Sequence, residues 1–73
     1  MRLLRRDKIT YVIECSYGNT TKYVSTIDTQ LGRVAMCSTY QYAKRYSNYD
    51  KALNDCEFVR SLYGPMGYKC VVS

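Results

Sequence analysis

Side chains that could carry out chemistry are few and widely spaced in this chain. Its 73 residues include four cysteines and no histidine. General acid–base catalysis needs a histidine or a carboxylate tuned by its environment, and a cysteine nucleophile needs a base to form its thiolate. Glu14 has no second acid nearby in the sequence, and no phosphate-binding glycine motif is present. We therefore expect a protein that is not an enzyme.

The cysteines also lack the spacing of a metal site, because no C-x-x-C pair occurs among Cys15, Cys37, Cys56 and Cys70. We expect no metal and no cofactor. An even number of cysteines in a short chain is compatible with disulfides, but residues 1–8 lack the apolar region of a secretory signal. We therefore expect a cytoplasmic protein with reduced, buried thiols. No apolar stretch approaches the roughly 20 residues of a membrane-spanning helix, so no membrane partner is expected.

Net charge and aromatic content point to binding as the function. The formal charge is +5, and nine residues are tyrosines. A basic balance favours an anionic partner, either nucleic acid or an acidic protein. Aromatic rings on a sheet flanked by positive charges can stack with single-stranded bases. The residues proposed for direct nucleic-acid binding are Tyr17, Lys22, Tyr23, Lys44 and Arg45.

Tyrosines and basic residues alternate most densely between residues 40 and 46. This segment holds Tyr40, Tyr42, Lys44, Arg45 and Tyr46. Aromatic and arginine side chains often dominate protein–protein contacts, so these five residues form a candidate partner-binding surface. The alternative is an ordinary connection whose tyrosines attach it to the core.

Phe58 and Leu62 form a second candidate contact. At about 100° per residue, Phe58 points nearly opposite the expected core stripe of its helix, and Leu62 shares that side. An exposed pair of this kind suggests a partner or a second copy of the chain. The alternative is that the N-terminal arm or the 28–46 connection covers it.

Two strands joined by a tight turn open the predicted fold. Residues 9–17 alternate between apolar and polar side chains, as in a half-buried strand. Gly18 and Asn19 suit a hairpin turn, and residues 20–27 form the return strand. A two-residue loop would place Ile13 opposite Val24, and a three-residue loop would change the register; both remain open.

A third strand, a helix and a last strand follow. Residues 34–40 and 67–73 are the strands, and the helix extends from about residue 48 to 63 with Ser47 as its N-cap. Gly64 is the expected C′ residue that ends it. The apolar stripe of this helix comprises Tyr49, Ala52, Leu53, Cys56, Val59 and Tyr63.

The order β-β-β-α-β predicts a small α+β fold, with an antiparallel sheet and one helix packed on one face. Residues 1–8 carry Arg2, Arg5, Arg6 and Lys8 and form a basic N-terminal arm. Residues 9–73 form a single domain. Because so small a core supplies only roughly 3–5 kcal/mol of net stability, a homodimer or larger homo-oligomer is a further candidate.

A further pattern combines the opening hairpin with residues 43–47, Ala52, residues 67–69, and Val71 with Val72. In this pattern the chain resembles small accessory proteins of phages and prophages of Gram-positive bacteria. It implies a protein that inhibits or redirects a host protein that handles nucleic acid, such as a nuclease of a CRISPR or restriction system. Direct nucleic-acid binding is the second hypothesis, and a structural role in a homo-oligomer is the third.

Overall fold

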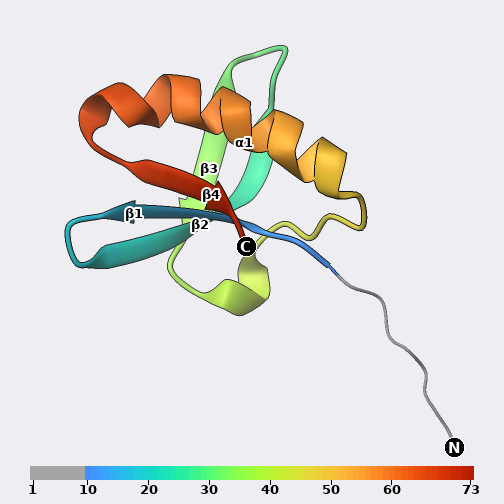
Figure 1. Cartoon of the computed structure of the whole chain (residues 1–73), viewed down its shortest axis with the longest axis horizontal. Coiled ribbons are helices and arrows are strands. Elements are labelled where there is room, and N and C mark those ends of the chain that lie inside the picture. The colour runs from blue at the N-terminus through green and yellow to red at the C-terminus, as the bar shows by residue number, and fades with distance from the viewer. Residues whose placement is uncertain (1–9) are drawn as a thin grey trace, which may run out of the picture.

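The computed structural model describes residues 10–73, so the predicted arm at residues 1–8 and Ile9 lie outside the described part. The protein is a small α+β fold with a four-stranded antiparallel sheet and one long helix (Figure 1), which confirms the predicted fold class. The elements are β1 (Ile13–Tyr17), β2 (Thr20–Asp28), β3 (Arg33–Cys37), η1 (Tyr40–Tyr42), α1 (Tyr49–Tyr63), η2 (Gly64–Met66) and β4 (Lys69–Val72).

The opening hairpin has the two-residue turn. Gly18 has φ +60°, and Tyr17 pairs with Thr20 directly across the turn. Cys15 therefore lies opposite Lys22, and Glu14 opposite Tyr23. Since side chains alternate between faces of a strand, Cys15 and Lys22 share the face that carries the core, whereas Tyr23 lies on the other face.

The strand order is β3-β2-β1-β4, so β3 and β4 form the two edges. The predicted third strand is shorter than expected: it ends at Cys37, and the chain then turns into η1. The first strand is also shorter than predicted. Tyr11 forms an isolated bridge with Tyr46 instead of continuing the ladder with β2. Between Val24 and Thr26 the pairing of β2 with β3 shifts register, as at a β-bulge.

The helix begins one residue later than predicted and does not end at a left-handed Gly64. Asn48 is the N-cap in place of Ser47, because its Oδ1 accepts a hydrogen bond from the Lys51 N–H at 3.0 Å. Gly64 has right-handed helical angles, φ −55° and ψ −46°. Pro65 fits the first turn of a helix, so the chain continues into η2. The left-handed residue is Gly67, with φ +100°.

The core lies between α1 and one face of the sheet. Its buried members are Ile13, Cys15, Val24, Tyr46, Ala52, Cys56, Val59 and Cys70. The buried side of α1 is rotated from the predicted stripe: Asp55 is buried, while Tyr49 is 48% exposed and Leu53 only partly buried. The physical reason is that Asp55 has a hydrogen-bonding partner in the core, described below. In Figure 1, η1 lies on the opposite side of the sheet from α1.

Candidate functional site

The connection between β3 and α1 is held by the sheet at several points. Within η1, Tyr42 N–H donates to Thr39 O and Ala43 N–H to Tyr40 O, both at 3.0 Å. The Lys44 N–H then donates to Val24 O at 2.9 Å, and Tyr46 exchanges two 2.8 Å bonds with Tyr11. Residues 44–46 thus join β2 to the segment preceding β1. The side chains of this connection therefore project from a fixed backbone.

Tyr40 occupies the centre of the exposed part of this connection. Its ring meets the Tyr23 ring edge-on, with centroids 5.5 Å apart and planes at 86°. The Arg45 guanidinium carbon lies 4.5 Å from the Tyr40 centroid, and Arg45 Nη2 donates to Tyr40 O at 3.4 Å. A T-shaped aromatic pair and a cation–π contact together restrict the ring. Tyr40 is nevertheless 49% exposed, so part of it is available to a partner.

Tyr42 and Lys44 extend the same exposed segment. Tyr42 is 66% exposed, and within residues 10–73 its ring contacts no other ring or cation in an aromatic or cation–π pair. Lys44 is exposed, and its Nζ lies 5.2 Å from the Tyr46 ring centroid. We call the set Tyr23, Tyr40, Tyr42, Lys44 and Arg45 the aromatic–basic surface. It combines large rings with two positive charges and has no acidic member.

Tyr46 does not belong to this surface, and the expectation that it contributes to partner binding is corrected. Its side chain is only 4% exposed, and its hydroxyl donates to Asp55 Oδ2 at 2.6 Å. Burial, and then the bond to Asp55, raise the pKa of the Tyr46 hydroxyl above its ordinary value of 10.0. Tyr46 therefore stays neutral at physiological pH and links the connection to α1.

Phe58 and Leu62 lie on α1, on the other side of the sheet from η1 (Figure 1). Leu62 is 38% exposed, but Phe58 is partly buried, so the predicted exposed pair is reduced to Leu62. The cause is the rotated helix phase, because the buried Asp55 lies one turn before Phe58 and brings that side closer to the protein. The structure does not bring these residues to the aromatic–basic surface.

The residues predicted for direct nucleic-acid binding are divided between the two faces of the sheet. Tyr23, Lys44 and Arg45 belong to the aromatic–basic surface. Lys22 lies opposite Cys15 on the core-bearing face, and Tyr17 shares that face by strand alternation. The Tyr17 ring packs against Tyr68, with centroids 5.2 Å apart. The five residues therefore do not form one continuous platform.

Three of the four cysteines are buried and offer little reactivity. All four are free, and Cys15, Cys56 and Cys70 are buried. Burial raises the pKa of the Cys15 and Cys56 thiols, which keeps them protonated at neutral pH and makes them weak nucleophiles. Across residues 10–73 no group of three His, Cys, Asp or Glu side chains is placed to hold a metal ion. The aromatic–basic surface remains the strongest candidate site.

Tyr23 belongs to the aromatic–basic surface, although its sequence pattern predicted it only for nucleic-acid binding. The alternation of side chains along β2 could have placed Tyr23 on this face, but only once the register of the hairpin was known.

No family model, curated protein or solved structure matches this chain. None of the helices within the described residues is both long and apolar enough to cross a membrane.

Proposed function

We propose that this chain is a small binding protein whose aromatic–basic surface docks on an acidic surface of another protein. The observation that carries the proposal is the arrangement of Tyr40 between Tyr23 and Arg45 beside the exposed Tyr42. Rings and guanidinium groups that are already ordered lose little conformational entropy on binding. Tyrosine and arginine are also enriched among residues that dominate interface energetics.

A protein partner fits this surface better than nucleic acid. Stacking of successive bases needs several accessible rings beside a positively charged groove. Here Tyr40 already contacts Tyr23 and Arg45, and Tyr17 with Lys22 lies on the other face. The resemblance to phage accessory proteins makes a host protein that handles nucleic acid, such as a CRISPR or restriction nuclease, the partner class to test first.

The test compares capture of partners by the wild type and by a Tyr42→Ala/Lys44→Glu variant from nuclease-treated host lysate, followed by binding measurements with the purified partner. Loss of the Tyr42 side chain at an interface hot spot costs about 2 kcal/mol or more, roughly thirtyfold in Kd. The matched control is Leu31→Ala/Lys69→Glu, which removes another exposed apolar side chain, 64% exposed in the case of Leu31, and reverses another lysine.

The proposal predicts that the partner is lost from the Tyr42→Ala/Lys44→Glu variant and retained by the control. Equal binding by both variants would contradict it. Direct nucleic-acid binding would instead appear as oligonucleotide affinity that falls steeply with salt, because phosphate contacts release counterions. An affinity of that kind, lost on Lys44→Ala/Arg45→Ala, would replace the proposed protein partner.

A further inference from the structure

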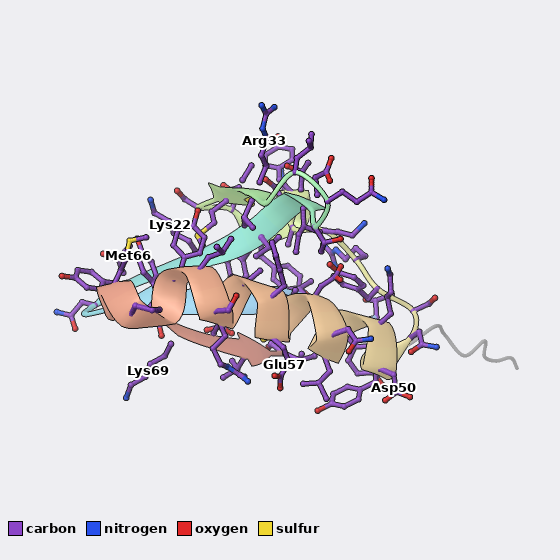
Figure 2. The ribbon with its side chains drawn as sticks, turned by 90° about the horizontal axis from the view of Figure 1, so that it is seen from above. Lys22, Arg33, Asp50, Glu57, Met66 and Lys69 are labelled. Atoms are coloured by element: carbon purple, nitrogen blue, oxygen red, sulfur yellow. The ribbon has the colours of Figure 1, made fainter. Side chains whose placement is uncertain are left out.

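The two edge strands of the sheet differ in how well their outward backbone N–H and C=O groups are protected. A strand at an edge presents unpaired N–H and C=O groups that can pair with another strand, and monomeric proteins usually protect such edges. Here the edges are β3 and β4. Figure 2 shows α1 lying over the side of the sheet that holds β4, with Arg33 of β3 projecting at the side away from the helix.

The β4 edge is capped by Arg60. Val12 and Ser73 exchange two hydrogen bonds, of 3.1 and 2.8 Å, so Ser73 directs its backbone groups toward the β1 side. Along an antiparallel strand these groups point alternately toward and away from the partner. Cys70 therefore directs its carbonyl away from β1, toward the outside. Arg60 donates to that oxygen from Nε at 3.2 Å and from Nη2 at 2.8 Å. An incoming strand would have to displace this guanidinium group.

The β3 edge has no comparable protection. The Ser25 hydroxyl donates to Ala35 O at 3.1 Å, so the Ala35 carbonyl faces β2, and Val34 and Met36 direct their backbone groups outward. Residues 33–37 contain no proline, and their only charge is Arg33 at the start. Within residues 10–73 no strand lies on the outer side of β3.

We propose that β3 pairs antiparallel with β3 of a second copy of this chain, around a two-fold axis at Ala35. In this register Val34 lies opposite Met36 of the second copy, and both residues have their N–H and C=O groups directed at the neighbour. The pairing joins the two sheets into one continuous sheet. It uses the whole of β3, from Arg33 to Cys37.

The side chains of β3 suit a copy of themselves. Val34 and Met36 are partly buried and pack at the border of the core, so cross-strand pairing of Val34 with Met36 extends an apolar row across the axis. Ala35, exposed on the opposite face, meets its own equivalent. Arg33 falls opposite Cys37, which leaves the two Arg33 residues roughly 13 Å apart along the strands, farther than the Debye length of about 8 Å at physiological salt.

Net charge provides a signature for this association. Two copies of a +5 chain repel one another, and added salt screens that repulsion. Self-association should therefore strengthen as salt rises, whereas binding to an acidic partner or to nucleic acid should weaken. The proposed dimer and the proposed partner site use different surfaces, so a result that contradicts one proposal does not contradict the other.

The test places charges at the two-fold axis. Ala35→Lys puts two ammonium groups opposite one another, which should weaken the dimer about tenfold or more by Coulomb repulsion at close range, and Ala35→Glu should do the same. An equimolar mixture of the two variants should restore association, because lysine then faces glutamate. Sedimentation velocity over a dilution series measures each sample, and circular dichroism confirms the fold. The matched control is Val71→Lys, at a position that is 49% exposed on β4, the other edge, and it should dimerise like the wild type.

Hydrogen exchange of the wild type gives a readout that needs no variant. The amide protons of Val34 and Met36 should exchange rapidly in dilute solution and slowly at high concentration. A wild type that stays monomeric throughout the dilution series, or a mixture of the Ala35 variants that associates no more than either alone, would overturn the proposal.

Discussion

Tyr46→Phe should be the most informative single substitution in the core. Tyr46 and Asp55 are 4% and 7% exposed, and the Tyr46 hydroxyl donates to Asp55 Oδ2 at 2.6 Å. Phenylalanine keeps the ring but leaves a buried acceptor without this donor. A hydrogen bond to a charged group contributes about 1.5–3 kcal/mol, so we expect a loss of about 2 kcal/mol. That is a large share of the roughly 3–5 kcal/mol of net stability available to so small a domain.

Urea denaturation followed by circular dichroism measures this loss. With a slope of about 1 kcal/mol per molar urea for a small chain, the midpoint should fall by about 2 M. Tyr42→Phe is the matched control, because Tyr42 is 66% exposed and its hydroxyl should contribute nothing measurable. Tyr46→Phe/Asp55→Leu removes both partners and should recover most of the loss, since replacing a buried pair by apolar groups is nearly neutral.

The same pair predicts the alkaline pH dependence. The pKa of Tyr46 is raised in the folded protein, first by burial and then by Asp55, so the fold favours the neutral hydroxyl. Its stabilisation is fully present below the ordinary pKa of about 10 and is lost as pH rises above that value. The stability difference between the wild type and Tyr46→Phe should be constant from about pH 7 to 9 and decrease above pH 10. A stabilising role of this hydrogen bond would be contradicted if Tyr46→Phe matched Tyr42→Phe in midpoint, or if the double variant were as unstable as Tyr46→Phe.

Three further substitutions test the end of α1 and the capped edge. Gly67→Ala should destabilise the fold by about 1–3 kcal/mol, because φ is +100° and the new Cβ would lie 3.0 Å from the Tyr17 ring. Gly64→Ala, at right-handed angles where the new Cβ would meet Arg60 Cγ at an ordinary 3.8 Å, should be neutral or stabilise by up to about 1 kcal/mol. Equal thermal midpoints for the two glycine variants would contradict this contrast. Arg60→Met keeps the apolar stem but uncaps Cys70 O, and light scattering should then detect species larger than the dimer. Assembly that stops at the same size as the wild type would show that Arg60 does not protect this edge.

Local signals in the sequence were sufficient for the type and order of the strands and the helix, although β1 and β3 are shorter than predicted. Alternation over residues 9–17 and 20–27 around Gly18 and Asn19 predicted the hairpin that the structure contains. The helix boundaries were correct within a residue or two, because the apolar period and the residues that terminate a helix act over only a few positions. Such signals do not distinguish Asn48 from Ser47 as the N-cap, since both residues are good caps and only the backbone geometry selects one.

The candidate site depended on contacts between distant parts of the chain. Tyr23 and Tyr40 meet only because η1 lies beside β2 on the face away from α1. Tyr46 became a core residue because Asp55, nine positions later, faces it across the packed helix, and a charged residue in a helix is expected by default to face water. The amino-acid sequence by itself determined which segments form strands and which forms the helix, since those preferences are local. Which tyrosines are available to a partner was decided only by the tertiary structure, because burial depends on the register of the hairpin and on the rotation of the helix against the sheet.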